Sequence, residues 1–115
     1  MRQFETGATR DTDETKLDYE GFLSPLSLEA YAKYLHKHRI QADGKLRDSD
    51  NWQKGIPKAV YMKSMFRHFM EVWKLHRGYP VQDPKTAQVI QKEEALCALA
   101  FNVLGYLHEV VKENV

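Results

Sequence analysis

The chain is most informative from Ser49-Asp50-Asn51-Trp52-Gln53-Lys54-Gly55-Ile56-Pro57 onward, a run that leads into the segment from Tyr61 to Gly78. The first part is polar and ends at a glycine, which is typical of a loop. Pro57 suits the first turn of a helix, and Gly78 suits the position just beyond a helix C-terminus. The stretch therefore predicts a loop followed by a long helix. Its core face would hold apolar residues at helical spacing, namely Met62, Met65, Phe66, Phe69 and Trp73.

A second stripe on the same predicted helix is polar and consists of Ser64, Arg67, His68 and Glu71. These residues lie three or four apart, so they share one side of the helix, a side that core packing does not need. Arg67 can fork two hydrogen bonds onto a phosphate. His68 and Glu71 can reach one metal ion or one water molecule together. The alternative is a solvent-facing stripe with an exposed Arg67–Glu71 ion pair, worth under about 1 kcal/mol.

Two further helices complete an all-α fold. Ser24 and Pro25 predict the start of a helix that runs to about Arg39. Asp83 and Pro84 predict the start of another, which runs to about Lys112 and contains Gly105. Gly105 costs roughly 1 kcal/mol of helix stability, so a close helix crossing would be a reason for it. Residues 1–115 are expected to form one domain, a bundle of about three main helices with residues 1–21 as an N-terminal arm.

The composition excludes several classes of protein. The chain has 115 residues with 17 basic and 16 acidic side chains and a net charge of +1, so no bulk charge attracts it to nucleic acid or to an anionic membrane. We expect no membrane span, no nucleic-acid partner and a cytoplasmic location. The single cysteine, Cys97, excludes an internal disulfide and is expected to be a small buried apolar residue. Three long helices would leave much apolar surface uncovered, which favours a homo-oligomer.

A pair of carboxylates, Glu93 and Glu94, precedes the apolar part of the last predicted helix. Adjacent helical residues point about 100° apart, so one can face a partner helix while the other faces its flank. Carboxylates suit magnesium, which prefers oxygen ligands and keeps several waters. The alternative is a solvated acidic patch. Asn102 lies two turns later among apolar residues and is either a structural hydrogen-bonding group or a base-reading group.

The loop before Pro57 also holds groups that can bind a nucleotide. Asn51 combines a donor and an acceptor, as the edge of a base requires. Trp52 offers a stacking surface and Lys54 a charge for phosphate. In the alternative, Trp52 fills the core and Lys54 is exposed. Arg10 and Lys16 can close over phosphates if the arm docks, and are otherwise solvated.

Taken together, these blocks resemble the phage-encoded dATP/dGTP diphosphohydrolase N-terminal domain family. The resemblance covers about residues 5–109 and rests on an ordered set of motifs. They are Gly7-Ala8-x-Arg10-Asp11, Lys16-x-Asp18, Asp50-Asn51-Trp52-x-Lys54-Gly55, Arg67-His68, and Glu93-Glu94-Ala95-Leu96-Cys97-Ala98 with Asn102.

That family is similar to the MazG-type all-α nucleoside triphosphate pyrophosphohydrolases. The resemblance implies a dimer or tetramer in which carboxylates hold Mg²⁺, or Mn²⁺, for attack of a metal-bound water on the α–β phosphoanhydride. Purine deoxynucleoside triphosphates, dGTP or dATP, would yield the monophosphate and pyrophosphate. If the chain is phage-encoded, the location would be the cytoplasm of the infected host.

The site residues that follow from this resemblance fall into three groups. Metal ligands would be Glu71, Glu93 and Glu94, with Glu71, Glu94 and His68 catalytic. Substrate would be bound by Arg10, Lys16, Asn51, Trp52, Lys54, Arg67 and Asn102.

The sequence departs from the MazG pattern, which has Glu-x-x-Glu on one helix and Glu-x-x-Asp on a later one. Here His68 replaces the first glutamate and Cys97 replaces the aspartate. Either the metal set is rebuilt from the three glutamates, with Asp50 or a partner subunit, or metal affinity is weak, or catalysis has been lost. The alternative function is therefore a non-catalytic helical phage module that binds nucleotides or a protein.

Overall fold

The computed structural model describes residues 2–11 and 14–115 of the chain, and these residues are mostly helical. The prediction of a helical fold is confirmed, with one small strand pair added. The elements are β1 (Arg2–Gln3), β2 (Thr9–Arg10), α1 (Tyr19–Phe22), α2 (Pro25–Lys37), the 3-10 helix η1 (Asn51–Lys54), α3 (Lys58–His76) and α4 (Lys92–Lys112).

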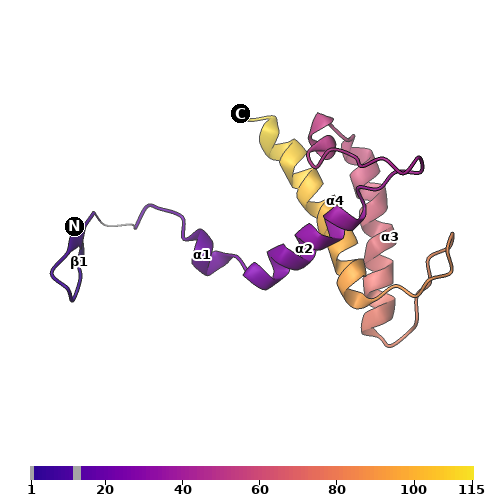
Figure 1. Ribbon diagram of the computed structural model, residues 1–115, viewed down its shortest axis with the longest axis horizontal. Coiled ribbons are helices and arrows are strands. Elements are labelled where there is room, and N and C mark those ends of the chain that lie inside the picture. The colour runs from indigo at the N-terminus through magenta and orange to yellow at the C-terminus, as the bar shows by residue number, and fades with distance from the viewer. Residues whose placement is uncertain (1, 12–13) are drawn as a thin grey trace.

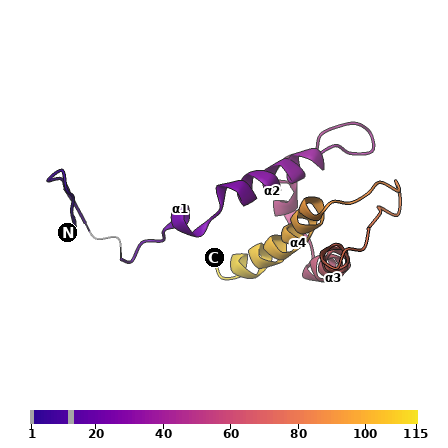
Figure 2. The same ribbon diagram turned by 90° about the horizontal axis from the view of Figure 1, so that it is seen from below.

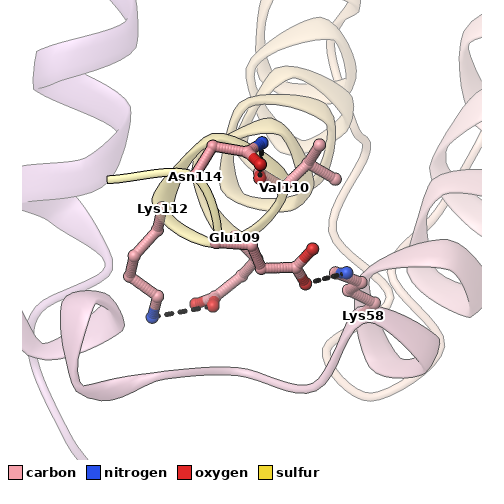
Figure 3. A network of polar contacts seen from close by, with 6 residues as sticks. Lys58, Glu109, Val110, Lys112 and Asn114 are labelled. Atoms are coloured by element: carbon pink, nitrogen blue, oxygen red, sulfur yellow. Dashed lines mark hydrogen bonds and ion pairs between the residues drawn. The ribbon is translucent and has the colours of Figure 1, made fainter.

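Helices α3 and α4 form the centre of the molecule as an antiparallel pair (Figure 1). Lys58 at the start of α3 forms an ion pair with Glu113 just beyond α4, which joins these two helix ends (Figure 3). In the interior, Tyr61 of α3 is 1 % exposed and lies over the backbone of Gly105 in α4. A side chain at position 105 would collide with the Tyr61 ring, so the expected close helix crossing at Gly105 is confirmed.

Helix α2 crosses α4, which lies between α2 and α3 (Figure 2). The predicted start of α2 is confirmed: the Ser24 hydroxyl oxygen accepts a hydrogen bond from the Ser27 backbone nitrogen at 3.1 Å, and Pro25 is the first helical residue. Its C-terminal turn, which carries Tyr34, faces both α3 and the loop that contains η1.

Helix α3 ends where its glycine signal predicts. Gly78 has a φ of +88°, the left-handed conformation that glycine adopts without steric cost. The backbone nitrogen of Gly78 donates to the Leu75 oxygen at 3.1 Å, and that of Tyr79 donates to the Lys74 oxygen at 2.9 Å. These two bonds form a Schellman motif, which satisfies the last carbonyl groups of the helix.

Helix α4 begins at Lys92, so the predicted start at Pro84 is wrong. Asp83 does accept backbone hydrogen bonds, but they stabilise a turn and not the N-terminus of a helix. Its side chain accepts from the backbone nitrogens of Lys85 at 2.8 Å and Thr86 at 3.1 Å. These bonds, with that from Lys85 the strongest, lower the pKa of the Asp83 carboxyl.

The segment after this turn folds back as a small hairpin. Gln82 pairs with Val89, and the Ile90 nitrogen donates to the Val81 oxygen at 2.9 Å. Ala87 has a φ of +61°, which interrupts any helix through this region. Ile90 is buried, whereas Val89, which we also expected in the helix, is exposed.

The predicted core face of α3 is wrong except at Met65, which is partly buried. Phe66, Phe69 and Trp73 are 69 %, 53 % and 53 % exposed, and Met62 is exposed as well. The insertion of Tyr61 against Gly105 fixes the rotation of α3. This rotation turns Ser64, His68 and Glu71 of the polar stripe towards the interior and leaves Arg67 exposed. The less exposed side of α3 holds Tyr61, Ser64, Met65, His68, Glu71, Val72 and Leu75.

The N-terminal arm extends away from the helices (Figure 1). Strands β1 and β2 form an antiparallel hairpin, in which Arg2 is opposite Arg10. The short α1 follows, and the Asp18 side chain accepts from the Gly21 nitrogen at 2.9 Å at its start. The described arm residues are almost all exposed.

Within the described residues, α4 is the one helix whose length and composition also suit a membrane span, with a mean hydropathy of 1.3 over its most apolar window. The expectation that the chain does not span a membrane stays a prediction. Core helices of water-soluble proteins meet the same criterion. The cytoplasmic location stays a prediction.

Candidate functional site

A cleft of about 400 Å³ lies between α2, α3, α4 and the turn at Asp83, and we call it the carboxylate cleft. Glu71 of α3 and Glu94 of α4 enter it from facing helices, together with the cationic Arg67 of α3 and Lys85 of the turn. The cleft thus combines oxygen ligands for a cation with positive groups for an anion. It is lined by Tyr34, His38, Arg67, His68, Glu71, Asp83, Pro84, Lys85, Ile90, Glu94, Ala95 and Ala98.

Both glutamates in the carboxylate cleft have a polar neighbour. The Nδ1 atom of His68 lies 2.5 Å from Oε1 of Glu71, and both side chains are mostly buried. This contact replaces the Arg67–Glu71 ion pair considered from the sequence, and it orients the Glu71 carboxylate. Lys37 Nζ lies 3.8 Å from Glu94 Oε2 in a much more exposed position. Glu94 is therefore held less firmly than Glu71, because an exposed ion pair contributes little.

Tyr34 of α2 brings a hydroxyl group to the same cleft. Burial raises its pKa to about 12, and the negative charges of Glu94, a Cys97 thiolate and Glu71 add to the effect. The hydroxyl is therefore protonated at neutral pH and can donate a hydrogen bond to an anion.

We expect the Glu94→Gln substitution to lower the pKa of Tyr34, because it removes a negative charge that opposes ionisation. The measurement is an ultraviolet titration of tyrosinate between pH 9 and 12, compared with a Tyr34→Phe variant that identifies the Tyr34 step. The pKa of Tyr34 is higher in the folded protein than in the unfolded chain. The stabilising contribution of the protonated hydroxyl is therefore fully present below pH 10, the pKa of the unfolded chain, and is lost as the pH rises through about 12. An unchanged Tyr34 step in Glu94→Gln would contradict the placement of Glu94 beside this hydroxyl.

A second cleft, of about 240 Å³, adjoins the first, and we call it the tryptophan cleft. Tyr34 and His38 line both clefts, and their rings lie 4.4 Å apart between centroids. Asn51 and Trp52 line the second cleft, as the sequence predicts for a base-binding pair, and both are half-buried. The cleft is lined by Tyr34, Leu35, His38, Arg39, Arg47, Asp48, Ser49, Asn51, Trp52, Ile56 and Phe101.

Trp52 also has a structural role. Its ring packs edge-on against His108 of α4, with 4.7 Å between centroids. The two interpretations of Trp52, a core plug and a stacking surface, thus both find support in its position.

Several predicted site residues lie away from both clefts. Glu93 faces an apolar surface depression beside Leu26 and Ala30 of α2, and not Glu71. Asn102 is buried and its side-chain nitrogen donates to the Ala98 carbonyl at 2.8 Å, which favours the structural alternative. Lys54 is exposed at the end of η1 and lines neither cleft.

Arg10 and Lys16 also lie outside the clefts, because the arm that carries them extends away from the helices (Figure 1). Cys97 is buried and faces the same depression as Glu93, and burial raises the pKa of its thiol. It is Ala98, not Cys97, that lies in the carboxylate cleft beside Glu94. An acidic side chain at position 97 would therefore not enter this cleft.

The sequence reasoning missed cleft residues that come from two segments. The sequence does not indicate Asp83 and Lys85 as site residues, because the Asp83-Pro84 pair has the signature of a helix start. Arg39 and Arg47 flank a loop that closes on itself: the Arg39 Nε donates to the Arg47 oxygen at 2.8 Å. The basic residues on either side of the Ala42-Asp43-Gly44 turn signal were the available sign that this loop presents cations.

The carboxylate cleft meets part of what a magnesium site requires. Among residues 2–11 and 14–115, no group of three or more His, Cys, Asp or Glu side chains is placed to hold a metal ion. Magnesium in nucleotide enzymes is bound by one or two carboxylates, with substrate phosphates and waters as the other ligands. Glu71 and Glu94 fit that smaller requirement.

Comparisons with known protein families, with curated proteins and with solved structures found no match.

Proposed function

We propose that this chain is a magnesium-dependent pyrophosphohydrolase of purine deoxynucleoside triphosphates, dGTP or dATP, which releases the monophosphate and pyrophosphate. One observation carries the proposal: Glu71 and Glu94 enter one cleft from facing helices, and Arg67 and Lys85 line the same cleft. A triphosphate with its magnesium needs both kinds of group at once. The resemblance of the sequence blocks to dATP/dGTP diphosphohydrolases supplies the substrate class.

In this proposal, Glu71 and Glu94 hold the cation, which when bound polarises the phosphoanhydride and lowers the pKa of a bound water. Mn²⁺ would serve the same role. His68 orients Glu71 through the contact at 2.5 Å. Arg67 and Lys85 bind phosphate oxygens, and the protonated Tyr34 hydroxyl donates to one more.

The tryptophan cleft would hold the nucleoside. It adjoins the carboxylate cleft at Tyr34 and His38, so one ligand can occupy both. Trp52 offers an aromatic surface to a base, and Asn51 offers a donor and an acceptor. Purine bases have the larger stacking area, which agrees with the proposed substrates.

A second candidate function is a non-catalytic helical module that binds nucleotides. The absence of a group of three metal-binding side chains in the described part of the chain favours it. Such a module would use the same two clefts and would bind triphosphates without turnover.

The deciding experiment measures pyrophosphate release from each of the four deoxynucleoside triphosphates by the purified protein, with magnesium or manganese. We expect release from dGTP or dATP that is abolished by a chelator. Thermal unfolding with the same nucleotides runs in parallel, because a bound ligand raises the unfolding temperature. Stabilisation by a nucleotide without release would instead establish the binding module. If the nucleotides cause neither stabilisation nor release, both functions are excluded.

A further inference from the structure

The carboxylate cleft and the tryptophan cleft meet at two side chains, Tyr34 and His38, near the C-terminal end of α2. Among residues 2–11 and 14–115, these are the two that line both clefts. Their rings lie 4.4 Å apart between centroids and are tilted by 45°. A ligand that occupies both clefts must cross this junction. The junction therefore contacts the part of the ligand that connects its two ends.

In a deoxynucleoside triphosphate, the connecting part is the α-phosphate. The proposed function places the nucleoside in the tryptophan cleft and the other phosphates, with their cation, in the carboxylate cleft. The inference that follows rests on this placement. The α-phosphate is an anion, and its two non-bridging oxygens accept hydrogen bonds. The Tyr34 hydroxyl can donate to one of them, which leaves the other for a second donor at the junction.

His38 has a donor that the protein itself does not use. Within the described part of the chain, no hydrogen bond or ion pair involves its ring nitrogens. His68, by contrast, has its Nδ1 atom 2.5 Å from Oε1 of Glu71. A neutral imidazole carries one N–H and a protonated imidazole carries two, so His38 can donate to a phosphate oxygen in either state.

The backbone fixes the position of His38 without help from its side chain. His38 is the residue at which α2 ends, and its backbone nitrogen donates to the carbonyl oxygens of Tyr34 and Leu35, each at 3.2 Å. The side chain is exposed. The fold therefore has no need of an imidazole at this position, whereas an anion at the junction does.

We propose that His38 binds the α-phosphate of the nucleotide, with a ring N–H that donates to a non-bridging oxygen. Arg67 and Lys85 line the carboxylate cleft alone and bind the phosphates further from the sugar. His38 is thus the residue that distinguishes a nucleotide from a nucleoside at the boundary between the two clefts.

The test is a calorimetric titration of the protein, in the presence of a chelator, with each purine deoxynucleoside and with its 5′-monophosphate. The monophosphate carries the α-phosphate alone, so the comparison needs neither cation nor turnover. We expect the wild type to bind the monophosphate more tightly than the nucleoside. His38→Phe keeps a ring beside Tyr34 but has no N–H. It should weaken monophosphate binding about 10-fold and leave nucleoside binding unchanged, as expected for one hydrogen bond to a charged group.

Two further variants separate the N–H group from other effects of the substitution. His38→Gln retains a side-chain N–H and should recover part of the lost affinity for the monophosphate. His36→Phe is the matched control, because it makes the same change two residues earlier on α2, at an exposed side chain that lines neither cleft. Its affinities should equal those of the wild type. Circular dichroism verifies folding, and His38→Ala replaces His38→Phe in the titration if the phenylalanine disturbs the fold.

Equal monophosphate affinities in the wild type and His38→Phe would overturn the inference. Equal weakening of nucleoside and monophosphate would place His38 against the sugar or the base and overturn it too. In both cases pyrophosphate release by the wild type from dGTP or dATP would leave the proposed function intact. A wild type that binds none of these ligands and releases no pyrophosphate would overturn the inference and the proposed function together.

Discussion

The Glu94→Gln substitution is expected to lower magnesium-dependent pyrophosphate release by about 100-fold or more. Loss of one of two carboxylate ligands removes several kcal/mol of charge stabilisation from the transition state, and each 1.4 kcal/mol is a factor of ten in rate. The fold should persist, because Glu94 is half-exposed and its ion pair with Lys37 spans 3.8 Å. The measurement is kcat at saturating dGTP and magnesium, with circular dichroism to verify folding.

Glu93→Gln provides the matched control for this prediction. The same chemical change occurs one residue away, but Glu93 faces the depression beside α2 and not the carboxylate cleft. We expect its activity to stay close to that of the wild type. Equal losses in the two variants would show that bulk negative charge near the start of α4, and not a ligand position, supports the activity.

The helix boundaries show what local chemistry can and cannot predict. Ser24-Pro25 and Gly78 mark helix ends correctly, because their hydrogen bonds involve only the neighbouring turn. Asp83-Pro84 has the same signature, yet Asp83 closes a turn. The difference depends on the hydrogen bond from Ile90 to Val81, which connects residues that no helical pattern pairs.

The rotation of α3 was not predictable from its periodicity. One side of the helix has Phe66 and Phe69 and the other has His68 and Glu71, and hydrophobicity alone assigns the first side to the core. The fit of Tyr61 into the space above Gly105 selects the opposite rotation. Apolar periodicity identifies a surface that must be covered, but it cannot tell whether the same chain or a second chain covers it.

The candidate site was predictable where it depends on helix geometry. Arg67, His68 and Glu71 lie together because of their spacing, and only one of the adjacent Glu93 and Glu94 enters the cleft because helical neighbours diverge by about 100°. The contributions of the turn, Asp83 and Lys85, depend on tertiary contacts. For Arg10 and Lys16 a role at the site remains a prediction that requires the arm to move.

The Gly105→Ala substitution is expected to destabilise the protein, although alanine is the better helix former. The helical preference favours alanine by about 1 kcal/mol. Against this, the new Cβ would lie 2.6 Å from Tyr61 Oη and even closer to two ring carbons, and Tyr61 is too buried to move aside. Overpacking of this kind costs about 1–3 kcal/mol or more, so the steric cost exceeds the helical gain. We expect the unfolding temperature to fall by roughly 5–10 °C.

A double-mutant cycle with Tyr61 tests the cause of this destabilisation. In a Tyr61→Leu background the colliding ring atoms are absent, so Gly105→Ala should cost much less there or even stabilise the helix. Tyr61→Phe is the control for the hydroxyl: its oxygen has no hydrogen-bond partner among the described residues, so its loss should change stability little. An unfolding temperature that rises in Gly105→Ala alone would contradict the placement of Tyr61 over Gly105. It would also contradict the assigned rotation of α3, which places Glu71 on the side of the helix that shares the carboxylate cleft with Glu94.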